Sequence, residues 1–102
     1  MMKSIKRIEI ITSSVELNTV LATLRRLEIS GYSIIRGVSG SGDRGITTCD
    51  LDVDGVCNDY VLALCEAAQE DALMTAIQPI LDRYGGVCIS TDATCLIHRG
   101  RL

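Results

Sequence analysis

The chain has 102 residues, of which 47% are hydrophobic and 23% charged. This length and composition suit one small globular domain and exclude a second domain of ordinary size. The 13 acidic side chains outnumber the 10 lysines and arginines, for a formal net charge of −3, so a nucleic-acid binder, which relies on clustered cations, is disfavoured.

The first third of the chain predicts a strand, a helix and a second strand. Residues 5–12 are rich in β-branched side chains that partly alternate with charged ones, as in a strand. Ser13 and Glu16 fit an N-terminal capping box at the start of a helix. Apolar residues at helical spacing follow the box, at Leu17, Val20, Leu21, Leu24 and Leu27. Gly31 fits the end of this helix, and residues 32–38 return to a β-rich composition.

The second half predicts the same alternation after a long loop. The loop, at about residues 39–58, lacks apolar periodicity and holds four glycines, and loops of this length usually carry function or stay disordered. Residues 60–65 are nearly all apolar, which predicts a strand with both faces covered. An apolar stripe over residues 69–84 predicts a second helix, which Pro79 should kink but not break. Residues 87–90 predict the last strand, and residues 93–97 either extend it or form a fifth one.

The order β-α-β-β-α-β predicts an α+β, ferredoxin-like fold, in which two helices cover one face of a four-stranded antiparallel sheet. The other face of such a sheet is bare, and alternating positions on it include apolar residues. Because an exposed apolar sheet is a liability, we expect copies of the chain to cover it by self-association.

The segment from Gly40 to Gly45 fits the pattern G-x-G-x-x-G. A dinucleotide-binding fold requires these glycines to open a helix, and the following residues, ITTCDLDVDG, do not form one. Glycine amides can still converge on an anion, and the forked cation of Arg44 suits phosphate. The segment therefore indicates either a phosphate contact or a flexible loop with a solvated arginine.

Asp50, Asp52 and Asp54 resemble the first half of a calcium-binding loop. The twelfth position of such a loop requires a bidentate glutamate, and Val61 stands there, so an EF-hand is excluded. The three carboxylates leave two alternatives, a divalent-cation site and a solvated acidic face. We expect no tightly bound metal.

Five cysteines are present, at Cys49, Cys57, Cys65, Cys88 and Cys95. Because they form no C-x-x-C pair and neither an export signal nor a membrane-spanning stretch occurs, we expect reduced, buried thiols in a cytoplasmic protein without membrane insertion. His98 is the only histidine and has no nucleophile near it in the sequence. We therefore predict no catalytic residue and no enzyme. Arg99 and Arg101 form a basic tip at the end of the sequence. This tip either is hydrated or reaches a phosphate across a subunit boundary.

The stretch ISGYSIIRGVSGSGDRG, residues 29–45, resembles the PII-like signalling proteins, in which a helix ends at Gly-Tyr, a strand follows and a glycine-rich segment opens a long T-loop. The element order agrees over essentially the whole chain, so the resemblance implies one PII-like domain at residues 1–102. The turn DRYGGV, residues 82–87, resembles the short B-loop of the branch linked to inorganic-carbon transport. The nitrogen-sensing branch has a lysine-rich B-loop and a T-loop tyrosine, and this chain has neither at the corresponding positions.

The resemblance implies a homotrimer with an adenine nucleotide (AMP, ADP, ATP or cyclic AMP) in each cleft between subunits, held by the T-loop base of one chain and the B-loop of the other. By position, the T-loop base corresponds to Gly40, Ser41, Gly42 and Arg44, and the B-loop to Tyr84, Gly86 and Val87. The T-loop would change its order with the nucleotide and so regulate a partner, a membrane transporter or an enzyme.

Two other families with this fold remain as alternatives, an ACT-like domain that binds a small ligand and a CutA-like trimer that binds divalent metal. The segment after the first strand, TSSVE, lacks the glycine usual in ACT-type domains, whereas the carboxylates of the long loop suit a CutA-like protein. RNA-recognition modules also share the fold, but they need aromatic side chains on the two central strands. Aliphatic residues occupy those strands here, at Ile8, Ile10, Val61 and Leu62.

Overall fold

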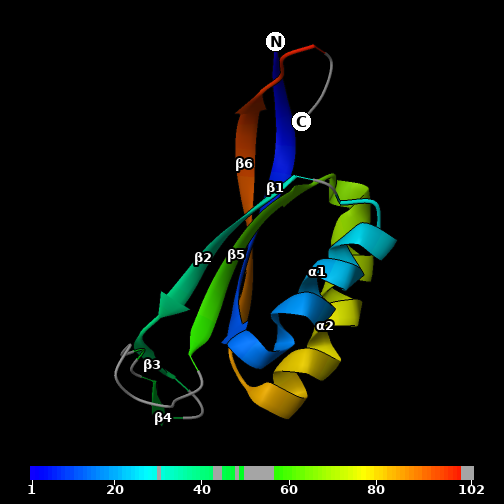
Figure 1. Ribbon diagram of the computed structural model, residues 1–102. Helices are drawn as coiled ribbons and strands as arrows, with labels where there is room; N and C mark the ends of the chain where they lie inside the picture. Colours follow the sequence, from blue (N-terminus) through cyan, green and yellow to red (C-terminus); the bar gives the residue numbers. More distant parts are fainter. Residues whose placement is uncertain (30, 43–44, 48, 50–56, 100–102) are drawn as a thin grey trace.

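A sheet and two helices form two layers (Figure 1). The computed structural model describes residues 1–29, 31–42, 45–47, 49 and 57–99. Its main elements are β1 (Met2–Ser13), α1 (Leu17–Arg26), β2 (Tyr32–Val38), β5 (Asn58–Cys65), α2 (Glu70–Tyr84) and β6 (Val87–Leu96). The strands pair antiparallel in the order β2-β5-β1-β6, and both helices lie on one face of the sheet. The predicted ferredoxin-like α+β fold is confirmed.

Both helices bury the apolar stripes that the sequence predicts. The buried side chains are Leu17, Val20 and Leu24 on α1, and Leu73, Ile77 and Ile80 on α2. A 3-10 turn precedes each helix, η1 (Ser14–Glu16) and η2 (Ala67–Gln69). The predicted capping box of Ser13 and Glu16 is not found: Ser13 Oγ accepts the N–H of Val15, at 3.3 Å, and so caps the 3-10 turn η1 and not the helix. The helix α2 continues through Pro79 without a break. Within the described residues, no helix is long and apolar enough to span a bilayer.

The strands β1 and β6 form a ribbon that extends past the rest of the sheet (Figure 1). Residues 6–13 of β1 pair with β5, whereas residues 2–5 pair only with β6, from Met2 opposite Leu96 to Ile5 opposite Ala93. β1 therefore begins three residues earlier than its local sequence predicts, because the partner strand supplies the pairing. For the same reason β6 is one continuous strand, and residues 93–96 extend it.

In the single chain only one face of β5 is covered, whereas the sequence predicts that both faces are. Burial alternates along this strand, with one set of side chains buried against the helices and the other only half-buried. The buried set is Asp59, Val61, Ala63 and Cys65. β5 is central, between β2 and β1, but the helices cover only one face of the sheet, so its apolar run does not imply two covered faces.

The glycine-rich segment also departs from the prediction of an irregular loop. The strand β3 (Gly40–Gly42) pairs with β4 (Gly45–Thr47), with Gly42 opposite Gly45. Gly45 has φ +91°, a conformation that side chains rarely adopt. This small two-stranded ribbon extends from the end of β2, and residues 43–44, which connect its strands, lie outside the described residues.

The uncovered face of the sheet carries exposed apolar side chains. Ile35, Val87 and Ile89 are 59%, 39% and 45% exposed in the single chain. A polar cluster lies on the same face, where Tyr60 Oη donates to Glu9 Oε2 at 3.1 Å, and burial is the main cause that raises the pKa of Tyr60. An isolated, half-apolar sheet face of this kind is typical of an interface.

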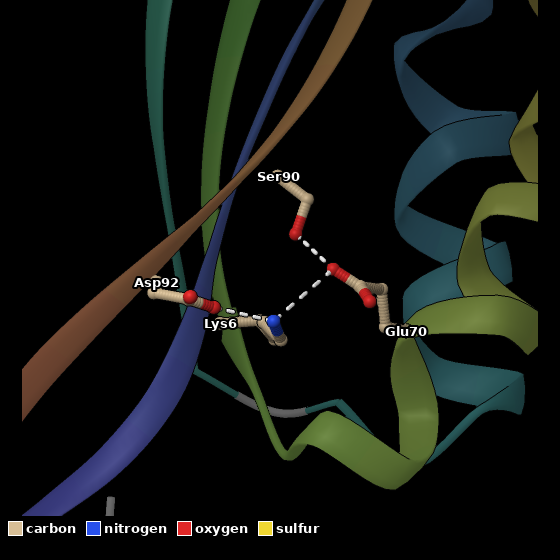
Figure 2. Close-up of polar contacts among 4 residues, drawn as sticks. All are labelled: Lys6, Glu70, Ser90 and Asp92. Atoms are coloured by element: carbon tan, nitrogen blue, oxygen red, sulfur yellow. Dashed lines mark hydrogen bonds and ion pairs between the residues drawn. The ribbon is translucent and has the colours of Figure 1, made fainter.

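On the face of the sheet that the helices cover, a charged cluster joins α2 to the ribbon of β1 and β6 (Figure 2). Lys6 of β1 donates to Asp92 of β6, and its Nζ lies 3.9 Å from Glu70 Oε2 at the start of α2. Ser90 of β6 donates to the same Glu70 carboxylate. The hydrogen bond with Asp92 is the main cause that raises the pKa of Lys6. The cluster therefore connects the first turn of α2 to β1 and β6, and it lies apart from the pocket described below.

Candidate functional site

The turn after α2 packs directly on the end of β1. Gly85 and Gly86 have φ +73° and +114° and turn the chain from α2 into β6. A Cβ on Gly86 would lie 2.1 Å from the carbonyl oxygen of Ile11, a distance at which backbone must move. The buried Thr12 Oγ1 donates to the Gly85 carbonyl at 2.9 Å. The sequence Gly-Gly is therefore required here by backbone conformation and by the close approach of β1.

A second turn, at the end of β2, is fixed by a buried carboxylate. The pairing of β2 with β5 shifts register between Arg36 and Val38, and Gly37 in the bulge has φ +75°. The N–H of Gly37 donates to Asp59 Oδ1 at 3.1 Å, and Asp59 is 5% exposed. Asp59 lies opposite Thr12 in the sheet, so the two turns are held by neighbouring side chains. This arrangement directs the glycine-rich segment toward the turn after α2.

These two segments line one pocket that encloses about 710 Å³, within the range of about 300–1,000 Å³ usual for small-molecule sites. The lining residues are Ile11, Ser13, Val38, Ser39, Gly40, Ser41, Gly42, Gly45, Asn58, Arg83, Tyr84, Gly86 and Val87. Six predicted site residues thus lie together, and the seventh, Arg44, lies outside the described residues. The resemblance implied that the T-loop base and the B-loop of one cleft come from two chains, whereas the structure brings both segments together within one chain.

The pocket combines polar donors with an apolar wall. Arg83 brings a cation, and its guanidinium lies 5.9 Å from the centre of the Tyr84 ring. Serine hydroxyls and glycine backbone occur on the side of β3, and the apolar side chains of Ile11, Val38 and Val87 on other parts of the wall. No carboxylate occurs among the described lining residues. Such a lining suits a ligand with an anionic group and a flat, weakly polar part.

Several lining residues were not predicted from the sequence. Ser13 and Asn58 are strand ends that reach the pocket only because β1 and β5 pair there. Arg83 lies within the segment that resembles a B-loop, but the resemblance assigned no binding role to it. The feature that could have identified it is its position immediately before Tyr84 and the glycine pair.

The expectation that all five cysteines are reduced is wrong for two of them. Cys49 and Cys57 form a disulfide. Cys65, Cys88 and Cys95 are free, and burial raises the pKa of the Cys88 thiol to about 11. Cys88 Sγ also lies 3.6 Å from Met74 Sδ. The sequence separation of the two cysteines does not by itself predict a disulfide, because the bond requires that the fold bring them together.

The half-buried thiol of Cys88 should react slowly with alkylating agents. With a pKa of about 11, only about one Cys88 thiol in a thousand is ionised at pH 8. Because the folded state holds this proton more tightly than the unfolded state, its contribution to stability falls as the pH rises from 9.0 to about 11. Iodoacetamide labelling between pH 8 and 11, followed by mass spectrometry, should show Cys88 modified far more slowly in folded than in urea-unfolded protein. Equal rates at pH 8 would contradict its burial.

The other candidate groups from the sequence do not add to this site. Asp50, Asp52 and Asp54 lie outside the described residues, within which no group of three metal-ligating side chains occurs. His98 and Arg99 are exposed at the end of the chain that the structure describes. Within the described residues, the pocket is therefore the candidate functional site.

The fold and the pocket define a small domain of ferredoxin-like architecture with a cavity of the size usual for small-molecule sites. Residues 5–98 match the family described as Nitrogen regulatory protein P-II, and the chain belongs to this family. The resemblance predicted from the sequence is confirmed, and the protein is a PII-like member of a family of signalling regulators. A comparison with curated proteins gave no match.

Solved structures share the fold at low sequence identity. CPII, a nitrogen regulatory PII-like protein from Thiomonas intermedia K12 bound to ADP, AMP and bicarbonate, has a TM-score of 0.85 and 22% identity, over 93% of this chain and 91% of that chain. A protein of Thermus thermophilus described as PII-like has a TM-score of 0.74 and 14% identity, over 93% and 92%. The ATP complex of B. subtilis GlnK has a TM-score of 0.64 and 12% identity, over 88% and 82%.

Proposed function

We propose that this protein is a homotrimeric, non-enzymatic sensor that binds an adenine nucleotide in the pocket and regulates a partner protein through the loop at residues 39–58. The observation that carries the proposal is the convergence of the segments Gly40–Gly42 and Tyr84–Val87 on one pocket. Structures of two relatives, CPII with ADP and AMP and GlnK with ATP, support an adenine nucleotide as the ligand class.

The chemistry of the pocket suggests how such a ligand would lie. Its phosphates would meet the glycine-rich β3 segment and the cations of Arg83 and Arg44, because backbone amides and guanidinium groups are the usual donors to phosphate. Its adenine would lie along the apolar wall that includes Val87, where backbone groups can recognise the edge of the base. Both parts of the ligand then meet groups of matching polarity.

The uncovered sheet face supports the trimer. Its exposed apolar side chains come from β2 and β6, on the face opposite the helices. Covering this face with other copies of the chain would remove apolar area from water, at about 25 cal/mol per Å². The pocket lies beside Val87, an exposed residue of that face, so a neighbouring copy would come close to the pocket as well. We therefore place the three nucleotide sites next to the subunit boundaries.

The proposal is tested first by ligand-induced stabilisation. AMP, ADP, ATP and cyclic AMP are each added to purified protein, and the unfolding temperature is followed. A nucleotide that binds only the folded protein at 100 times its dissociation constant adds about 2.7 kcal/mol of stability, a clear upward shift. No shift with any of the four would overturn the proposed function.

Replacing the phosphate-binding cations should weaken this binding. Arg44→Ala and Arg83→Ala are each expected to raise the dissociation constant roughly 10- to 150-fold, since a charge-assisted hydrogen bond contributes about 1.5–3 kcal/mol. Titration calorimetry measures the change, and Arg26→Ala, an exposed residue at the end of α1, serves as the control with unchanged affinity. Unchanged affinity in either test variant refutes the role of that arginine.

The family match decides against the ACT-like and CutA-like alternatives. The branch of the family and the partner are proposed on the sequence alone: the short B-loop favours the branch linked to inorganic-carbon transport, and the proposed partner is a membrane transporter or an enzyme. The cytoplasm is the proposed location.

A further inference from the structure

A disulfide joins Cys49 to Cys57, close to the pocket. The Cα atoms of the two cysteines are 5.0 Å apart, and their sequence separation is 8. Both cysteines are half-buried. Disulfides are rare in the cytoplasm, and those that occur there are usually transient and catalytic or redox-sensing. A disulfide in the proposed compartment is therefore a candidate switch.

The Cys49 end of the disulfide is bonded to the wall of the pocket. The Cys49 N–H donates to Ser39 Oγ at 2.9 Å, and Ser39 lines the pocket. The Cys49 sulfur also lies close to the bulge of β2, since a Cβ on Gly37 would come within 3.2 Å of it. Cys49 thus packs on the short connection between β2 and β3, from which the glycine-rich wall begins.

The Cys57 end is bonded to the start of η1, next to the end of β1. The carbonyl oxygen of Cys57 accepts both the N–H and the Oγ–H of Ser14, at 2.7 and 2.6 Å. The neighbours of these two residues, Ser13 and Asn58, line the pocket. The covalent bond therefore connects the glycine-rich wall, through Ser39 and Cys49, to the ends of β1 and β5.

We propose that the Cys49–Cys57 pair is a redox switch that sets the affinity of the pocket for its nucleotide, with the disulfide form binding more tightly. This inference rests on the proposed function. Val38 pairs with Asn58 in either redox form, whereas the disulfide also holds the chain that follows, from Ser39 onward, before the ligand arrives, so binding costs less ordering. In the dithiol form Cys49 is held by non-covalent contacts alone, and the ligand must order the chain beyond Val38 itself.

The chemical step is thiol–disulfide exchange. A low-molecular-weight disulfide, such as oxidised glutathione, accepts two electrons and the sulfurs of Cys49 and Cys57 lose them. One cysteine thiolate attacks the oxidant and releases one thiol, and the second cysteine thiolate then displaces the other thiol from the mixed disulfide. The two protons lost by the cysteines leave on the two released thiols. A dithiol reductant reverses the sequence.

The test compares ADP affinity in the two redox forms. Protein equilibrated with oxidised glutathione and protein reduced with a phosphine are titrated with ADP by calorimetry, and mass spectrometry after alkylation in urea counts the free thiols. We expect three free thiols and a dissociation constant about three- to tenfold lower in the oxidised protein, and five free thiols in the reduced protein. Cys49→Ser and Cys57→Ser should bind ADP as the reduced protein does under both conditions.

Cys95→Ser is the matched control, because Cys95 is a free, half-buried cysteine on β6 away from the pocket. It should keep the full redox response. Two results overturn the switch: five alkylated thiols after treatment with the oxidant, or equal ADP affinity in both redox forms. Neither result touches the proposed function, which fails only if no adenine nucleotide binds in either form.

Discussion

Gly86→Ala should destabilise the protein by about 3 kcal/mol or more. The added carbon would lie 2.1 Å from the Ile11 carbonyl oxygen and 3.1 Å from the Thr12 Cα, both backbone atoms of β1. Its backbone conformation, φ +114°, is also one that alanine rarely adopts. The turn must therefore move away from β1. Urea unfolding at fixed protein concentration measures the loss.

The same substitution should also abolish nucleotide binding, because Gly86 and Ile11 both line the pocket. Gly31→Ala is the control: a Cβ at Gly31 meets nothing within 4 Å, and its stability should change by about 0.5 kcal/mol or less. If Gly86→Ala and Gly31→Ala unfold at the same urea concentration, the close approach of the turn to β1 is not a feature of the folded protein.

Local periodicity was sufficient to predict the two helices and the four strands of the main sheet. The stripe on α1 and the bounds of β2, residues 32–38, follow from side chains a few positions apart, and both are found in the structure. Element ends that depend on a partner strand were missed. β1 starts at Met2 because β6 pairs with it there, and no pattern in the first four residues predicts that pairing.

The glycines of the candidate site could be predicted from the sequence. The residues whose roles depend on the pairing register of β1 and β5 could not. Gly40 and Gly86 stand out in the sequence, because glycine marks turns and close approaches. Thr12 and Asp59 look like ordinary strand residues. Their roles, holding Gly85 and Gly37, arise because they lie opposite each other in the paired strands β1 and β5. The Cys49–Cys57 bond was missed for the same reason, since it depends on tertiary proximity.

Ile35→Asp should convert the proposed trimer into single chains. Ile35 is 59% exposed in the single chain, on the sheet face that the helices leave uncovered, so a carboxylate there costs the isolated fold little. In an assembly that buries this face, each copy would instead bury an unpaired charge, at a cost of about 3 kcal/mol or more per chain. Sedimentation velocity at micromolar concentration should show three chains for the natural sequence and one for the variant.

Val15→Asp is the control that shows whether loss of assembly requires a charge on the uncovered sheet face or follows from any added surface charge. Val15 is 64% exposed, close to the value for Ile35, but it lies on η1, beside the helix layer. A carboxylate at this position should leave the assembly intact, because nothing in the proposed trimer covers it. Equal sedimentation of the two variants, or a natural protein that sediments as one chain, would show that the uncovered sheet face is not where copies meet. Loss of assembly in Ile35→Asp alone would assign the interface to that face, and with it the boundary beside which the nucleotide is proposed to bind.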